Sequence, residues 1–263
     1  MGRIIAVANQ KGGVGKTTTS INLAASLAAT KRNVLLIDLD PQGNATMGSG
    51  VNKHGLQATV YDVLMGDIDA RDAIIPGTNG GYDLLPANQE LTAAEVHLLE
   101  TEQREHRLQK ALVSIADDYH YIYIDCPPSL NMLTVNALVA AHSVLIPMQC
   151  EYFALEGISA LLQTVDQIRE ALNPDLHIEG VLRTMFDPRN NLAGDVAQQL
   201  QDHFGERLYN TIIPRNVRLA EAPSHGLPAL VYDKLSSGSK AYLTLAGEVL
   251  RRDKVPFSEI TAQ

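Results

Sequence analysis

Apolar runs and amphipathic stretches alternate along the whole chain. Apolar runs bounded by turn residues predict strands at residues 4–8, 34–37, 82–85, 121–124, 143–147, 178–185 and 211–214. Apolar residues at helical spacing predict helices at 17–30, 59–65, 133–141, 155–172, 192–204 and 239–252, and a helical stretch at 91–118 that breaks within its charged middle, 100–107. This alternation is typical of α/β folds, in which a mostly parallel sheet lies between two layers of helices.

The 263 residues contain no linker or internal repeat that would divide them. We therefore expect one domain over 1–263, with a short flexible tail at about 254–263. No apolar run reaches the roughly 20 residues that a membrane span needs. Cys126 and Cys150 form no C-x-x-C pair, which argues against a disulfide framework or a metal cluster. These features predict a soluble, cytoplasmic protein.

One segment, Lys11-Gly-Gly-Val-Gly-Lys-Thr-Thr18, follows the first predicted strand and opens the first predicted helix. Strand, glycine loop and helix in this order form a phosphate-binding loop, in which backbone N–H groups and the helix dipole attract phosphate. The predicted nucleotide-binding residues of the loop are Lys11, Gly12, Gly13, Val14, Gly15, Lys16, Thr17 and Thr18. With this loop, the expected fold class is a three-layer P-loop NTPase. The alternative is a glycine-rich turn that contains lysines by chance.

Within this loop, Lys16 is expected to reach the β- and γ-phosphates and the Thr17 hydroxyl to bind Mg²⁺. The sequence departs from the general pattern in one respect. Asn9 or Gln10 stands where that pattern begins with glycine, and a second lysine, Lys11, opens the loop.

Three aspartates follow predicted strands. Asp125 comes directly after 121–124, and Asp38 and Asp40 come after 34–37. Ligands of open α/β sheets bind at the carboxyl ends of the strands, so we assign Asp125 to Mg²⁺. Asp40 is assigned to orienting the attacking water, and Asp38 to Mg²⁺ or lysine contacts. The alternatives are a helix-capping role for Asp125 and a plain surface turn around Asp38 and Asp40.

Four segments together resemble the ParA/Soj partition ATPases, which carry a deviant Walker A loop. They are Lys11-Gly-Gly-Val-Gly-Lys-Thr-Thr18, Asp38-Leu-Asp-Pro-Gln-Gly-Asn-Ala-Thr46, Asp125-Cys-Pro-Pro-Ser129 and Ile213-Pro-Arg-Asn-Val-Arg-Leu-Ala-Glu-Ala-Pro-Ser224. The resemblance implies Mg²⁺-dependent hydrolysis of ATP to ADP and phosphate. It also implies a homodimer that encloses two ATP molecules, in which Lys11 reaches the partner's nucleotide. Lys11, Lys16 and Asp40 would then be the catalytic residues.

The resemblance also implies adenine contacts from Pro214 and Asn216 and sequence-independent binding of double-stranded DNA by Arg189, Arg215 and Arg218. Lys234 and Lys240 are possible neighbours of these arginines. A centromere-binding partner of the ParB/Spo0J type would stimulate hydrolysis, and the protein would associate with the nucleoid. The net charge of −9 argues mildly against nucleic acid as a partner, and the arginines could also be ordinary solvated or salt-bridged side chains.

Two rival functions use the same scaffold. A MinD-like ATPase of division-site placement would need a basic amphipathic helix at its C-terminus, but residues 251–260 contain Pro256 and few apolar positions. A metabolic ATP-dependent enzyme would need a pocket for a small substrate, which the sequence does not identify. The sequence therefore favours a DNA-partition ATPase that does not act on a membrane.

Overall fold

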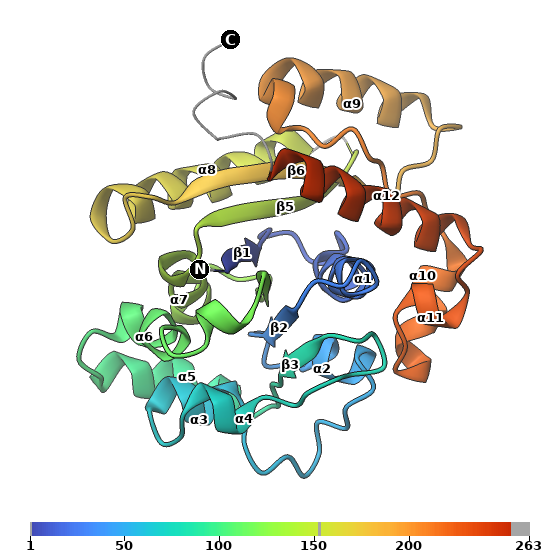
Figure 1. Cartoon of the computed structure of the whole chain (residues 1–263). Helices are drawn as coiled ribbons and strands as arrows, with labels where there is room; N and C mark the ends of the chain where they lie inside the picture. Colours follow the sequence, from blue (N-terminus) through green and yellow to red (C-terminus); the bar gives the residue numbers. More distant parts are fainter. Residues whose placement is uncertain (1, 152–153, 254–263) are drawn as a thin grey trace.

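A computed structural model describes residues 2–151 and 154–253 and shows a central sheet with helices on both sides (Figure 1). All strand pairs of the six-stranded sheet are parallel, in the order β3-β2-β4-β1-β5-β6. The strands are β1 Arg3–Val7, β2 Val34–Asp38, β3 Asp83–Leu85, β4 Tyr121–Asp125, β5 Ser143–Gln149 and β6 His177–Thr184. The predicted tail at 254–263 lies outside the described residues.

Two hydrophobic clusters lie on opposite faces of the sheet. Along β1, Ile4 and Ala6 belong to one cluster, and Ile5 and Val7 to the other, because neighbouring side chains point to opposite faces of a strand. The helices are α1 Lys16–Ala28, α2 Asn44–Gly48, α3 Val60–Met65, α4 Ala70–Ala73, α5 Leu91–His97, α6 Arg107–Leu112, α7 Met132–Ala140, α8 Ala154–Ala171, α9 Asn191–Phe204, α10 Val217–Glu221, α11 Ala229–Tyr232 and α12 Ser237–Arg252.

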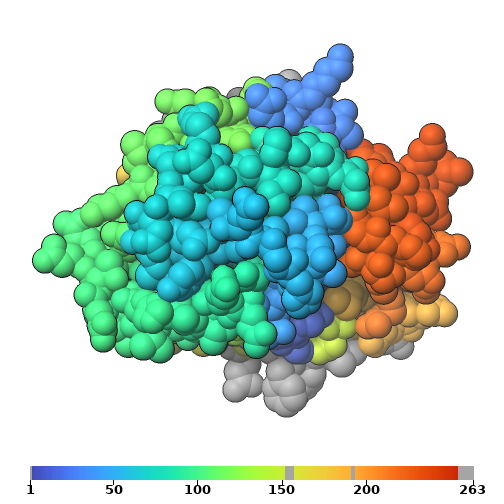
Figure 2. Space-filling model, turned by 90° about the horizontal axis from the view of Figure 1, so that it is seen from below, coloured from blue at the N-terminus to red at the C-terminus, as the bar shows by residue number. Residues whose placement is uncertain are grey.

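Helices α1 and α12 pack beside each other on one face, and α3 and α5 to α9 contribute to the cluster on the other. The three-layer α/β architecture expected from the sequence is thereby confirmed. The expected break between α5 and α6 is also present. Figure 2 shows α10 and α11, in orange, as a block at one side of the molecule, next to the blue segment around α2.

One predicted strand, at 211–214, is wrong. This segment runs beside β6 but forms only an isolated bridge between Phe186 and Pro214. The amide of Thr211 donates to the carboxylate of Glu248 on α12 at 2.8 Å, so the hydrogen bonds to β6 are interrupted between Tyr209 and Ile213 and no regular ladder forms. The short helices α2, α4, α10 and α11 were not predicted, since four or five residues are too few to show a helical period.

Both outer edges of the sheet are covered by chain that is not itself strand. On the β3 side, the backbone N–H groups of Ile75 and Leu84 each donate to the other's carbonyl. On the β6 side, Tyr209 donates its N–H to Val181 O and Ile213 donates to Arg183 O. The backbone of both edge strands is therefore paired in part within the protomer.

Candidate nucleotide-binding site

The glycine loop lies between β1 and α1 in the conformation that its sequence predicts. Gly13 and Gly15 have φ angles of 75° and 86°, in the left-handed region that favours glycine. Gly15 is the N-cap of α1, so no side chain caps the N–H groups of the first turn, which remain available for an anion. Gly12 and Gly13 are exposed, and Val14 is buried below them.

Lys16 is buried, with a relative exposure of 7%. Its ammonium group donates to the backbone oxygen of Lys11 at 3.3 Å, across the loop. Burial lowers the pKa of Lys16, while the charges of Asp125 and Asp40 oppose that shift. The hydrogen bond of this ammonium group to Lys11 is long and goes to a neutral oxygen, so phosphate would offer it stronger, charge-assisted hydrogen bonds.

Asp125, at the end of β4, contacts the first turn of α1. Its Oδ2 accepts a hydrogen bond from Thr17 Oγ1 at 2.7 Å, and its Oδ1 accepts one from Ser20 Oγ at 2.8 Å. Complete burial raises the pKa of Asp125 to about 6, although these hydroxyls lower it. The structure therefore brings together Thr17 and Asp125, two of the three side chains assigned to Mg²⁺. Ser20 was not predicted, although its position three residues after Thr17 places it on the same face of α1.

Asp38 and Asp40 lie at the end of β2 in different environments. Asp38 is completely buried, and its Oδ2 accepts hydrogen bonds from both the backbone N–H and the Oγ1 of Thr46 at 2.7 Å. Burial, and then the charge of Asp125, raise the pKa of Asp38 to about 7. Asp40 is 8% exposed and accepts the N–H of Gln42 at 2.9 Å.

This arrangement gives Asp38 a structural task that sequence reasoning missed, because its carboxylate holds α2 through Thr46. Its assignment to Mg²⁺ or lysine contacts stays a prediction, as does the assignment of Asp40 to the attacking water. Thr46 is completely buried, so its hydroxyl has no contact with solvent. Its Oγ1 also accepts the N–H of Ala87 at 2.9 Å.

Lys11 points out of its own protomer's loop. Its side chain is 45% exposed, and its ammonium group lies 2.5 Å from a carboxylate oxygen of Glu151. The backbone N–H of Lys11 donates to Asn9 Oδ1 at 3.0 Å, and Asn9 in turn donates to Pro147 O at 2.8 Å. The backbone of Lys11 is therefore held through Asn9 by Pro147 within β5, and its side chain by Glu151 just after β5. Thr18, the last loop residue, is half-buried and accepts a hydrogen bond from Asn22 at its carbonyl.

The residues predicted to contact adenine lie in a segment that is well fixed. Pro214 forms the bridge with Phe186, just beyond β6. Asn216 caps α10 by accepting the N–H of Leu219 at 3.3 Å, and its amide group donates to Ser237 Oγ at 2.8 Å. The bridge holds the backbone of Pro214, and the two hydrogen bonds hold the side chain of Asn216, in the absence of a bound base. Their contacts with adenine stay a prediction.

The predicted DNA-contacting arginines are exposed, and two of them form ion pairs. Arg189 donates to both carboxylate oxygens of Asp187 at 2.9 and 2.7 Å. Arg218 lies 2.7 Å from Glu221 and 3.4 Å from Asp233. Each would have to exchange a carboxylate for a DNA phosphate. Arg215 also lies near Asp187, since both its charge and that of Arg189 lower the pKa of this carboxyl. The structure therefore brings Arg189 and Arg215 together.

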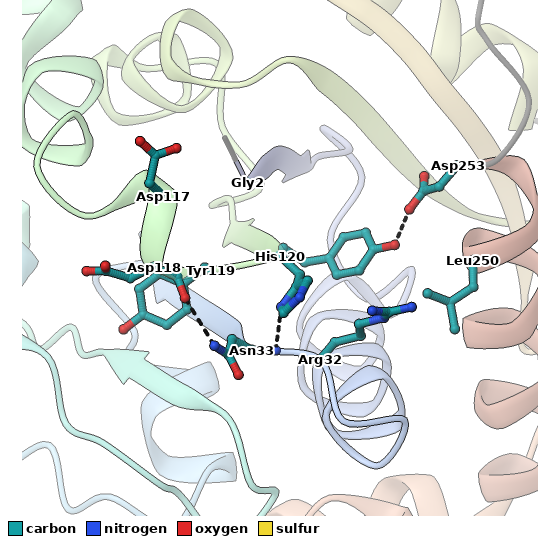
Figure 3. Close-up of a pocket in the computed structure, with 10 residues that line it drawn as sticks. Gly2, Arg32, Asn33, Asp117, Asp118, Tyr119, His120, Leu250 and Asp253 are labelled. Atoms are coloured by element: carbon teal, nitrogen blue, oxygen red, sulfur yellow. Dashed lines mark hydrogen bonds between the residues drawn. The ribbon is translucent and has the colours of Figure 1, made fainter.

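A pocket of about 480 Å³ lies at the amino ends of the strands (Figure 3). Its lining includes Gly2, Asn33 and His120, which directly precede β1, β2 and β4, whereas the loop follows the carboxyl end of β1. This pocket is therefore distinct from the phosphate loop.

Across residues 2–151 and 154–253, acidic, histidine and cysteine side chains form no group of three that could hold a metal ion alone. No helix in this part is long and apolar enough to cross a membrane.

The chain is similar to known proteins over almost its whole length. A family model described as an AAA domain matches residues 2–178. The sporulation initiation inhibitor protein Soj of Bacillus subtilis is 54% identical, over 95% of this chain and 98% of that protein. The chromosome partitioning protein ParA of Caulobacter vibrioides is 51% identical, over 96% of this chain and 95% of that protein.

A solved structure described as cobyrinic acid a,c-diamide synthase from Mycobacterium smegmatis, with bound ATP analog and magnesium, is also similar. It has a TM-score of 0.85 and 39% identity, and the match covers 97% of this chain and 96% of that one. Its similarity confirms the fold. The identity to Soj and ParA, together with a loop that begins at Lys11, shows that the chain belongs to the ParA/Soj family of P-loop proteins.

Proposed function

We propose that this protein is a DNA-partition ATPase that binds Mg²⁺ and ATP at the glycine loop. The observation that carries the proposal is the hydrogen bond between Thr17 and Asp125, beside the buried Lys16 of the glycine loop. Hydroxyl and carboxylate oxygens are suitable ligands for Mg²⁺, and they lie where P-loop enzymes hold it. Bound there, the ion would neutralise charge on the phosphates.

The residues of the loop divide the remaining work. The N–H groups at the start of α1 and the ammonium group of Lys16 would hold the phosphates, and Lys16 would gain charge-assisted hydrogen bonds to them. Asp40 lies 8% exposed at the end of β2, where it would orient the attacking water and accept its proton. Pro214 and Asn216 would contact the adenine.

Lys11 would act on a second protomer. Its ammonium group is exposed and held by Glu151, outside its own loop. A cation that arrives from a partner stabilises the charge that develops on the transferred phosphoryl group only when two protomers meet. Hydrolysis would thereby require an ATP-bound homodimer.

The ATP-bound dimer would bind double-stranded DNA without sequence preference through Arg189, Arg215 and Arg218, which would place the protein on the nucleoid in the cytoplasm. A centromere-binding protein of the ParB/Spo0J type would stimulate hydrolysis and release the dimer. A basic segment of such a partner suits a chain whose net charge is −9.

A metabolic ATP-dependent enzyme is the second candidate, and the similarity to the structure described as cobyrinic acid a,c-diamide synthase favours it. The relatives named Soj and ParA are 54% and 51% identical, compared with 39% for that structure. We therefore prefer the partition function.

The test is a DNA-binding assay with ATP, with ADP and without nucleotide, each with and without liposomes of anionic lipid. We expect retention on DNA with ATP only, and no retention on liposomes. Retention on liposomes with ATP would indicate a MinD-like function instead. ATP turnover without any DNA retention would favour the metabolic enzyme.

A further inference from the structure

The glycine loop is hydrogen-bonded to the end of β6. Thr184, the last residue of β6, is 2% exposed, and its Oγ1 donates to the carbonyl oxygen of Val14 at 2.7 Å. The two segments are also packed together, since a Cβ atom added to Gly15 would lie 3.7 Å from Met185 Cε and 3.8 Å from Thr184 Cβ. The phosphate loop and the end of β6 are therefore in direct contact.

The hydroxyl of Thr184 orients one peptide group of the loop. In a trans peptide the C=O and the following N–H point in opposite directions. Because the carbonyl of Val14 points to Thr184, the N–H of Gly15 points away from β6. A phosphate oxygen that accepts this N–H would pull on the same peptide plane that Thr184 holds from the other side.

The chain turns sharply directly after Thr184. Met185 has a φ angle of 49°, in the left-handed region that residues with side chains rarely adopt. Such a conformation persists only when neighbouring contacts hold it. The residue before Met185 is Thr184, which is hydrogen-bonded to the loop, and the residue after it is Phe186. The direction in which the following segment leaves β6 therefore depends on Met185.

That segment contains Arg189 and is hydrogen-bonded to the chain that contains Arg215, two of the proposed DNA-contacting arginines. Phe186 donates its N–H to Ile213 O at 3.0 Å, and its carbonyl accepts the N–H of Arg215 at 3.2 Å. The next residue, Asp187, accepts both the backbone N–H and the guanidinium of Arg189. Arg189 and Arg215 are thus both fixed to the two residues that follow Met185.

From these contacts we infer that Thr184 is a positioning residue that couples nucleotide binding in the loop to the presentation of Arg189 and Arg215 for DNA. A shift of the Val14–Gly15 peptide on phosphate binding changes the bond to Thr184, and through Met185 it changes the position of both arginines. This inference rests on the proposed function, because it needs ATP and DNA as the two ligands.

The test compares Thr184→Val, which keeps the shape of the side chain and removes the hydroxyl, with Thr184→Ser, which keeps the hydroxyl. For each protein, DNA affinity is measured with and without a non-hydrolysable ATP analogue, and the ratio of the two affinities is the coupling factor. Affinity for the analogue is measured with and without DNA, since linkage requires the same factor in both directions. Light scattering gives the dimer fraction, and a thermal melt checks the fold.

We expect Thr184→Val to reduce the coupling factor about fivefold or more, within the roughly 5- to 150-fold range of such couplings. Its dimer fraction with the analogue should match that of the unaltered protein, and Thr184→Ser should restore the coupling to within about twofold. If Thr184→Val is too unstable to measure, Thr184→Ala, which also lacks the hydroxyl, replaces it and is judged by the same criteria. A factor lowered by about fivefold in Thr184→Ser, which retains the hydroxyl, also overturns the inference.

Two further results would overturn the inference while leaving the proposed function in place. One is a coupling factor in Thr184→Val equal to that of the unaltered protein. The other is loss of coupling together with loss of the dimer, because the hydroxyl would then act on dimer formation and not on the arginines. If the unaltered protein itself shows no effect of ATP on DNA binding, the proposed function fails first.

Discussion

The hydroxyl of Thr17 and a carboxylate oxygen of Asp125 lie 2.7 Å apart, although 108 positions separate the two residues in the chain. β1 and β4 are neighbours in the sheet, with Val7 opposite Asp125, so the carboxyl ends of both strands reach the same point. The contact fixes the carboxylate against α1 before any metal arrives.

Asp125→Asn should therefore weaken the Mg²⁺ dependence of ATP binding. We expect about a 10- to 100-fold loss of Mg²⁺ affinity, with ATP binding in the absence of Mg²⁺ little changed. Calorimetric titration of ATP with and without Mg²⁺ measures both. Asp175→Asn, at an exposed carboxylate beyond the other end of the sheet, is the control. An unaltered Mg²⁺ dependence in Asp125→Asn would remove the residue from the metal site.

Lys11→Ala should leave ATP binding largely intact and abolish the ATP-dependent dimer, because its ammonium group lies outside its own loop. Glu151→Gln is the matched control, since it breaks the same ion pair and keeps the lysine, so it should still dimerise. The exposed pair contributes less than about 1 kcal/mol, and neither change should alter the melting temperature appreciably. Dimers of Lys11→Ala in light scattering would contradict the proposal.

Asp40→Ala should trap an ATP-bound dimer on DNA, since the carboxylate that orients the attacking water is lost while the loop is kept. The assay follows phosphate release and DNA retention in the same sample. We expect phosphate release to fall about 100-fold or more and retention to persist. A variant that hydrolyses ATP at the normal rate would show that Asp40 has another task.

Arg189→Glu or Arg218→Glu should lose DNA retention while the ATP-dependent dimer persists. Asp187→Asn should have the opposite effect, because it frees Arg189 from its bidentate partner. Binding should weaken steeply as salt rises, since each arginine releases a counterion from DNA. A shallow salt dependence, or an unchanged affinity in both arginine variants, would locate the DNA surface elsewhere.

Stability without nucleotide should depend on pH through Asp38. Burial raises the pKa of Asp38 to about 7, whereas the unfolded chain has the ordinary value near 4. The folded protein therefore binds more protons between these values, and its free energy of unfolding should fall as pH rises from about 4 to 7, by on the order of a few kcal/mol. Urea denaturation across this range measures the trend. In Asp38→Asn this contribution should disappear.

The sequence predicted most of the sheet and the phosphate loop because both depend on local patterns. Apolar runs such as 121–124 are buried on both faces, and a strand–glycine–helix order needs only neighbouring residues. The strand at 211–214 was predicted wrongly because its apolar pattern does not reveal that Glu248, far along the chain, takes the amide of Thr211.

Contacts made within loops were likewise hidden in the candidate site. Nothing in the sequence indicated that Thr46 would hold Asp38, eight positions away, or that Asp187 would hold Arg189, two positions away. Both contacts depend on the path that the backbone takes through its loop, which a pattern of apolar residues does not reveal. The roles of Lys11, Asp40 and the arginines stay predictions.

Coverage of both outer strands has a consequence for higher-order assembly. Ile75 is hydrogen-bonded to the backbone of β3, and Tyr209 and Ile213 are hydrogen-bonded to the backbone of β6. A second copy would find fewer open N–H and C=O groups with which to extend the sheet, which disfavours polymer growth by strand addition. An assembly that does not extend the sheet relies on contacts between side-chain surfaces, and such surfaces can separate again once their shape changes.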